Sequence, residues 1–146
     1  MGLDTGWEVA DDFEAGFTLL ELMICLAIVA ILTMLALPNY HHYLRRAYYL
    51  ELVQAAMPYK LGVSGCFQEQ GDLQLCRGGN ADVPPDRQDV SDSIVSISTN
   101  EGRIHVVPRA VHGIDSADDY WLIPEIQDGQ LRWHPEGGGV AQGYVR

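Results

Sequence analysis

The chain has few basic side chains: Lys and Arg together number 9 against 20 Asp and Glu, and the formal net charge is −11. So acidic a composition argues against broad binding to nucleic-acid phosphates, which depends on clustered Lys and Arg. Cysteine is also scarce, and no second pair of Cys or His stands at ligand spacing beside the three that are present. We therefore expect neither strong nucleic-acid binding nor a zinc site.

Catalytic and metal-binding motifs are lacking as well. No Ser-His-Asp order, nucleotide-binding glycine loop or paired-acid motif stands out, so we expect no enzyme and no cofactor. His41 and His42 are adjacent and would point about 100° apart on a helix, which keeps them from sharing a metal ion. The remaining histidines are scattered and expected at the solvated surface: His105, His112 and His134. The acidic loop with Asp115, Asp118 and Asp119 lacks the glycine and distal glutamate of a calcium loop, so we expect a solvated turn.

What the chain does contain is one long apolar run, Phe17 to Leu37, with a single charge at Glu21. Its 21 residues meet the length that a membrane-spanning helix needs. The preceding residues 1–16 hold five acids, no base and no apolar core of a secretory signal, so the run itself is the insertion signal. A carboxylate inside hydrocarbon costs about 2.5–3.5 kcal/mol. On charge and spacing alone, Glu21 could equally be a boundary acid at headgroup level.

The string Gly16-Phe17-Thr18-Leu19-Leu20-Glu21, followed at once by the apolar run, resembles the processing signature of type IV prepilins. The resemblance implies that a prepilin peptidase cuts between Gly16 and Phe17 and that the new amine of Phe17 is methylated. It also implies that Glu21 is retained for assembly, where it would pair with the Phe17 amine of a neighbouring subunit.

This resemblance divides the chain into three parts. Residues 1–16 would be a leader removed on maturation, residues 17–40 a hydrophobic helix, and residues 41–146 the globular head. The helix would first cross the inner membrane and later form the core of a surface filament. Because the peptidase of this family acts on the cytoplasmic side, the head would be periplasmic, although the leader is acidic and the nearest bases, Arg45 and Arg46, lie beyond the far end of the run.

The helix is expected to continue past Pro38, with a kink or local break at that residue and a further bend at Pro58. Pilins often have a glycine at the position of Ala30, where the helix melts in filaments, so melting here would depend more on Pro38.

Apolar residues then recur at steps of three or four and predict an amphipathic helix whose apolar face packs on the head. These residues are Tyr40, Tyr43, Leu44, Ala47, Leu50, Val53, Met57 and Leu61. The opposite face, with Arg45, Arg46, Glu51 and Gln54, would look outward. The whole helix would have about 45–55 residues.

Cys66 and Cys76, close together in a small domain beyond an anchor, indicate a disulfide in an oxidising compartment, with a pair of free thiols as the alternative. The pair also resembles pilins that carry a disulfide just after the helix, although the C-terminal cysteine pair of many pilins is absent. Cys25 is interpreted as a small apolar residue facing lipid or a neighbouring helix.

The rest of the chain predicts an antiparallel sheet of about four strands. Gly71–Asp89 is expected to be a loop, and the turns Asn100 to Arg103 and Gln127 to Gly129 are expected to close two hairpins. The predicted strands are Val90–Thr99, Ile104–Pro108, Asp119–Ile126 and Gln130–His134. A loose tail would follow from Pro135. The fold class is therefore α+β, one long helix packed on the sheet as in type IV pilins.

Three functions fit these features. The first is a structural subunit that polymerises with its own kind into a helical type IV pilus through the pilus assembly machinery, serving motility, adhesion or DNA uptake. The second is a minor pilin or a type II secretion pseudopilin of the same architecture. The third is a periplasmic binding module on an uncleaved membrane anchor, which would explain the apolar helix but not the string Gly16 to Glu21.

Overall fold

The computed structural model describes residue 2 and residues 16–145, so the leader expected at 1–16 lies almost wholly outside the described residues. The chain forms two compact units, Met1–Pro38 and Asn39–Arg146, which are described separately below. One helix, α1 (Leu19–Gln70), contributes residues to both units.

Helix α1 has 52 residues, within the predicted length. The break expected at Pro38 is absent, because helical structure is assigned on both sides of this residue and at the residue itself. A proline removes a single backbone donor, and the remaining hydrogen bonds of the helix are sufficient to keep the local conformation helical.

The first unit consists of the apolar part of α1 and the residues before it. Each large apolar side chain in this part is exposed over at least half of its surface. These side chains are Phe17, Leu19, Leu20, Leu22, Met23, Ile24, Leu26, Ile28, Val29, Ile31, Leu32, Met34, Leu35 and Leu37. By length and composition, α1 is the one helix among the described residues that could cross a membrane.

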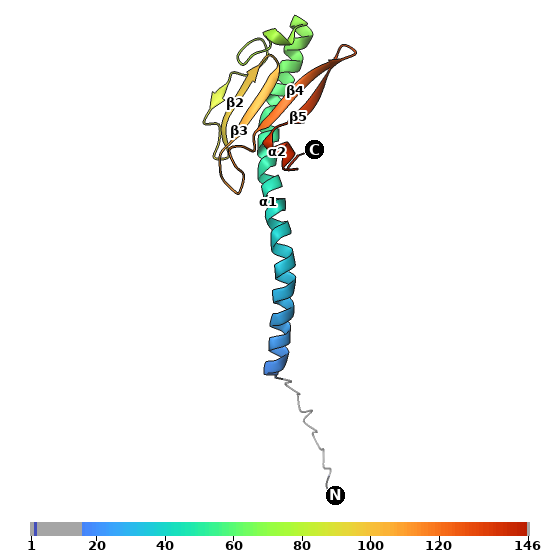
Figure 1. Cartoon of the computed structure of the whole chain (residues 1–146), viewed down its shortest axis with the longest axis vertical. Helices are drawn as coiled ribbons and strands as arrows, with labels where there is room; N and C mark the ends of the chain where they lie inside the picture. Colours follow the sequence, from blue (N-terminus) through green and yellow to red (C-terminus); the bar gives the residue numbers. More distant parts are fainter. Residues whose placement is uncertain (1, 3–15, 146) are drawn as a thin grey trace. The chain divides into compact units, whose positions relative to one another are not determined.

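The second unit contains one antiparallel sheet in the order β1-β2-β3-β4-β5 (Figure 1). The strands are β1 (Arg87–Gln88), β2 (Ile94–Asn100), β3 (Arg103–Pro108), β4 (Tyr120–Gln127) and β5 (Gln130–Glu136). The four predicted strands are confirmed with small shifts at their ends. The prediction missed β1, whose two residues pair with β2 inside the segment expected to be a loop, because so short a strand has no detectable periodicity.

Both predicted hairpin turns are present and lie at the expected residues. Glu101 and Gly102 have φ angles of 53° and 74°, and Asp128 and Gly129 have 51° and 77°. Two successive residues with positive φ form the type I′ turn, whose twist matches that of antiparallel strands and which favours Asp or Asn followed by Gly. These short turns hold β2 to β3 and β4 to β5 in register.

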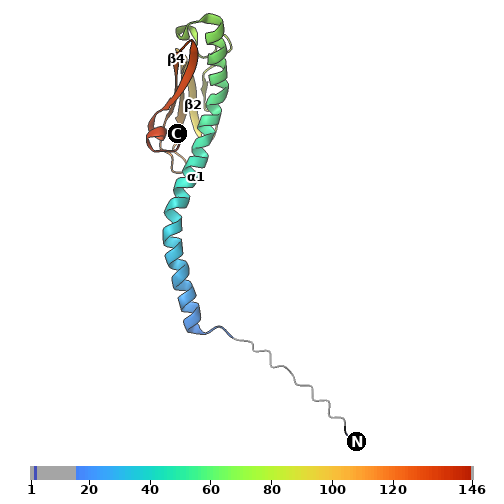
Figure 2. The ribbon, with the colours of Figure 1, turned by 90° about the vertical axis from the view of Figure 1, so that its right-hand side faces the viewer.

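The sheet packs on the C-terminal part of α1, which Figure 2 shows beside it. The face of α1 that packs there differs from the predicted one. The buried residues are Tyr49, Leu52, Ala56, Tyr59, Gly62, Val63 and Cys66. Most of the predicted face is exposed, including Tyr43 at 70%, Leu50 at 49% and Leu61 at 74%. Both faces repeat with the helical period, so the period identified the helix without identifying its buried side.

The C-terminal segment is ordered by contacts with the rest of the second unit, and the expectation of a loose tail from Pro135 was wrong. Strand β5 continues to Glu136 and a short helix, α2 (Gly138–Ala141), follows it. Tyr144 is buried, and its ring centroid lies 5.3 Å from that of Tyr49 on α1. Gly139 packs so closely on Tyr49 that an added Cβ would lie 2.0 Å from the ring.

Candidate functional site

The processing motif ends in the first turn of α1: Gly16, Phe17 and Thr18 precede the helix, and Leu19, Leu20 and Glu21 begin it. Thr18 caps the helix, because its side-chain Oγ1 accepts a hydrogen bond from the Glu21 backbone N–H at 3.2 Å. Its carbonyl oxygen accepts another from the Leu22 N–H at 3.1 Å. Thr followed three residues later by Glu is the spacing of a capping box, a local signal that the sequence analysis missed. Glu21 therefore has a local reason for its place in the first turn, where the helix dipole also favours an acid.

The peptide bond between Gly16 and Phe17 lies outside the helix. Both residues are exposed, Phe17 at 75%, and among the described residues no neighbouring atom lies within 4 Å of a Cβ added at Gly16. A cut here would create an amine just before the helix N-terminus, where a positive charge is unfavourable. Glu21 is the only acid between this amine and Glu51 in the sequence, so it is the nearest carboxylate that could compensate the charge locally.

The two residues predicted to act in assembly lie far apart. Pro38 follows Glu21 by 17 positions in the same helix, a separation of about 25 Å at 1.5 Å per residue. They therefore do not form one site.

The predicted disulfide between Cys66 and Cys76 is present, with the two Cα atoms 5.8 Å apart. Both residues are fully buried. The bond ties the last turns of α1 to the 3₁₀ helix η1 (Leu73–Leu75), whose first turn is capped by Asp72. It thus fixes the beginning of the loop segment against the core of the second unit.

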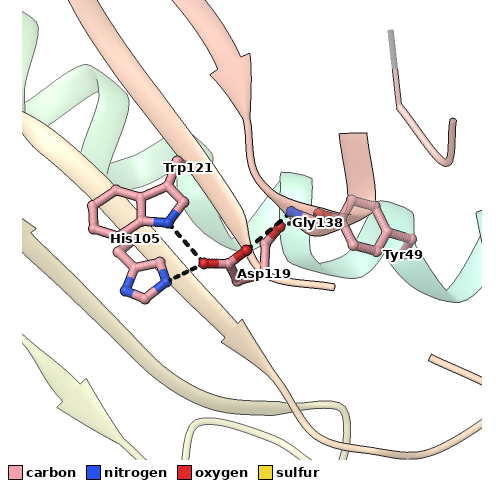
Figure 3. A network of polar contacts seen from close by, with 5 residues as sticks. All are labelled: Tyr49, His105, Asp119, Trp121 and Gly138. Atoms are coloured by element: carbon pink, nitrogen blue, oxygen red, sulfur yellow. Dashed lines mark hydrogen bonds and ion pairs between the residues drawn. The ribbon is translucent and has the colours of Figure 1, made fainter. Parts of the chain in front are cut away.

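A polar network around Asp119 joins four parts of the second unit, and the sequence analysis did not predict it (Figure 3). One carboxylate oxygen accepts hydrogen bonds from His105 Nε2 at 2.9 Å and from Trp121 Nε1 at 2.7 Å. The other accepts one from the Gly138 backbone N–H at 3.0 Å. The Asp119 carbonyl oxygen accepts a further bond from the Tyr49 hydroxyl of α1 at 2.9 Å. The residue therefore links β3, β4, α1 and the C-terminal segment.

At neutral pH, Asp119 and Tyr49 are in the protonation states that the hydrogen bonds of this network require. Burial alone would raise the pKa of Asp119, but hydrogen bonds from Gly138, His105 and Trp121 outweigh it and hold that pKa below its ordinary value. Burial raises the pKa of Tyr49, so its hydroxyl stays protonated and donates to the Asp119 carbonyl. Asp119 is consequently an anion with satisfied acceptors.

His112 and His134 are exposed, as expected, whereas His105 is half-buried; in the acidic loop Asp115 is exposed, but the other two acids are less solvated than the sequence suggested. Asp118 is buried, and its side chain accepts a hydrogen bond from the Asp115 backbone N–H at 2.9 Å. The ring of His112 stacks on Tyr48 at a centroid distance of 3.9 Å, and His134 contacts Glu125 at 2.8 Å. Over the described part of the chain, no group of three His, Cys, Asp or Glu side chains is placed to hold a metal ion.

Parts of the chain are similar in sequence to known proteins. Residues 13–37 match the family model described as the prokaryotic N-terminal methylation motif. Prepilin peptidase-dependent protein D of Escherichia coli strain K12 is 41% identical over 73 residues, 50% of this chain and 50% of that protein. The type IV pilus subunit protein TapA of Aeromonas hydrophila is 49% identical over 72 residues, 49% of this chain and 51% of that protein. The chain thus matches about half the length of these relatives.

A solved structure extends the comparison to the fold. The solution NMR structure of the major type IV pilin PpdD from enterohemorrhagic Escherichia coli matches with a TM-score of 0.51 and 23% sequence identity. The match covers 64% of this chain and 69% of that one. The chain thus matches the N-terminal methylation motif, is similar over about half its length to a prepilin peptidase-dependent protein and to a type IV pilus subunit, and has the fold of a type IV pilin.

Proposed function

We propose that this protein is a prepilin whose mature form polymerises into a type IV pilus filament and has a structural rather than a catalytic role. A prepilin peptidase removes residues 1–16 by cutting between Gly16 and Phe17, and the Phe17 amine is methylated. The mature subunit is held in the inner membrane by residues 17–40, with residues 41–146 as its periplasmic head. The assembly machinery then transfers it to a helical filament at the cell surface.

The observation that supports this role most directly is the unpartnered apolar surface of α1. From Phe17 to Leu37, every large apolar side chain is exposed over at least half of its surface. Such a surface is stable only in lipid or against other apolar helices. A filament core made of the same helix from many subunits supplies the second environment after lipid has supplied the first.

Within that core, Glu21 needs a positive partner. The Phe17 amine of a neighbouring subunit is the partner that the motif provides, and the pair would set the axial step between subunits, since a buried charged pair can specify register. Pro38 would allow the helix to open locally as the filament forms.

The test uses two substitutions at one position, because Glu21 lies at the capping-box position as well as in the predicted pair. Glu21→Gln preserves the capping-box pattern and removes the charge, whereas Glu21→Ala removes both. We expect both precursors to be cut after Gly16, measured by mass spectrometry of the mature N-terminus, and both to yield few or no filaments in electron micrographs. Normal filaments from Glu21→Gln would refute charge pairing, and an intact leader on surface material would refute the processing step.

Copy number distinguishes a major pilin from a minor pilin or a pseudopilin. If the protein is the main subunit, sheared surface material will contain fibres about one pilin wide that consist mostly of this chain. Trace amounts in fibres made of another subunit would assign it to the second class. A membrane-anchored binding module would give no fibres and no cleavage at Gly16.

A further inference from the structure

The residues that immediately follow the apolar part of α1 are unusual for this chain in their charge. Between Glu21 and Glu51 there is no acidic residue, although the chain as a whole carries a net charge of −11. Arginines and tyrosines gather in the first turns of the second unit. We call these residues the arginine–tyrosine collar: Tyr40, Tyr43, Arg45, Arg46 and Tyr48. All five are exposed.

Arg45 and Tyr48 line a shallow hollow of about 300 Å³ together with His41 and His112. The Arg45 guanidinium passes so close to Gly113 that an added Cβ would lie 2.7 Å from Arg45 Nε. The Tyr48 ring stacks on His112 with an interplanar angle of 9°. These contacts hold a cation and an aromatic ring beside each other at the surface of the second unit.

Arg46 lines a second hollow, of about 390 Å³, with Tyr43, Leu50 and Tyr144. The two arginines are thus each accompanied by a tyrosine. Of the ion pairs formed by described residues, none involves Arg45 or Arg46, since the arginine pairs are Arg77 with Glu101 and Arg109 with Asp89. Both guanidinium groups are free to bind an external anion.

We propose that the arginine–tyrosine collar binds the phosphate groups of anionic phospholipids on the head's side of the membrane and so holds the unassembled subunit at the bilayer surface. This inference depends on the membrane insertion of residues 17–40 proposed above. The collar begins two residues after Pro38, so it would lie at headgroup depth when the apolar run spans the bilayer. Tyrosine favours that depth because its ring and hydroxyl match the boundary between hydrocarbon and water. Guanidinium groups bind phosphate oxygens in a bidentate manner.

The experiment uses the full chain in uncharged detergent micelles, titrated with phosphatidylglycerol or phosphatidylcholine and analysed by native mass spectrometry. We expect phosphatidylglycerol to be retained in preference to phosphatidylcholine. A basic residue near an anionic lipid surface changes binding by about fivefold, so Arg45→Gln with Arg46→Gln should weaken phosphatidylglycerol binding about 25-fold. Retention of phosphatidylcholine should not change.

Two further variants separate charge from structure. The double change Arg45→Lys with Arg46→Lys preserves both charges and should retain most of the preference. The matched control, Arg77→Gln with Arg132→Gln, removes two exposed arginines elsewhere in the second unit and should bind lipid like the unmodified chain. Circular dichroism of all variants checks that they are folded.

The proposal is overturned if both lipids are retained equally, or if the control weakens binding as much as the collar variant does. It is also overturned if millimolar inorganic phosphate displaces the lipid, because the site would then be one for free phosphate. Lipid retention is measured on the uncut chain and needs no filament. Failure of this test with normal cleavage and fibres would reject the collar alone, whereas a bound lipid without fibres would reject only the filament role.

Discussion

Replacing Asp119 should release the C-terminal segment from the rest of the second unit. In Asp119→Ala, three donors lose their acceptor: His105 Nε2, Trp121 Nε1 and the Gly138 N–H. A hydrogen bond to a charged group contributes about 1.5–3 kcal/mol when desolvated. The Asp119 side chain is 27% exposed, so water can replace part of each bond, and we use about 1 kcal/mol per donor. The expected loss is about 3 kcal/mol, or about 12 °C in Tm for a unit of this size.

The assay is thermal unfolding of the full chain in detergent micelles, followed by tryptophan fluorescence, with hydrogen exchange at the Gly138 and Gly139 amides as a local probe. Both amides should exchange faster in Asp119→Ala, because each donates to an Asp119 oxygen or lies beside it. Glu125→Ala is the matched control. Its pair with His134 has nearly the same length, 2.8 Å, but both side chains are more than half exposed, so the loss should be below about 1 kcal/mol.

The pH dependence gives this prediction a second readout. Because the pKa of folded Asp119 is lowered, its contribution is fully present above the ordinary value of about 3.9 and is lost as the pH falls through the lower folded value. The difference in unfolding free energy between the unmodified chain and Asp119→Asn should therefore be constant from pH 7 to pH 5 and shrink below pH 4. A difference that stays constant down to pH 2, or Asp119→Ala and Glu125→Ala variants of equal stability, would refute the reasoning.

Two other predictions concern the core of the second unit. Replacing Cys66 and Cys76 together by Ser should lower the unfolding free energy by about 2–3 kcal/mol, since the unfolded chain loses a closed loop, and an unchanged denaturation midpoint would contradict this. Val63→Ala should cost about 2 kcal/mol because Val63 is fully buried, whereas Leu61→Ala, at a position 74% exposed, should cost less than about 0.5 kcal/mol. Chemical denaturation of both variants tests which face of α1 is buried, and equal costs would mean that the face is assigned wrongly.

The exposed face of α1 has a further consequence for assembly. Tyr43, Leu50 and Met57 repeat every seven residues and remain exposed, on the side opposite the buried Leu52, Ala56 and Val63. The apolar pattern that predicted packing on the head is therefore available to another apolar surface. In the proposed filament, that surface would be the helix of a neighbouring subunit.

Local signals were sufficient for much of this protein. The length of the apolar run, the string Gly16 to Glu21, the Glu101-Gly102 and Asp128-Gly129 turns and the cysteine spacing each depend on residues near one another in the chain. Helical period and turn residues act over a few positions, so the sequence alone determined the long helix and both hairpins and indicated the disulfide.

Contacts between distant residues were decided only by the tertiary structure. The helical period could not tell which side of α1 meets the sheet, because apolar residues recur on both sides. The buried side of α1 is the one that contains Tyr49 and Tyr59. Their hydroxyl groups donate hydrogen bonds to the carbonyl oxygens of Asp119 and Pro85, which lie 70 and 26 residues away in the sequence. The C-terminal segment is ordered for the same reason, since Asp119 accepts hydrogen bonds from the backbone N–H groups of Gly138 and Gly139. A polar group that is buried needs a hydrogen-bond partner, and that partner can come from a distant part of the chain. The neighbouring residues in the sequence do not indicate which partner it will be.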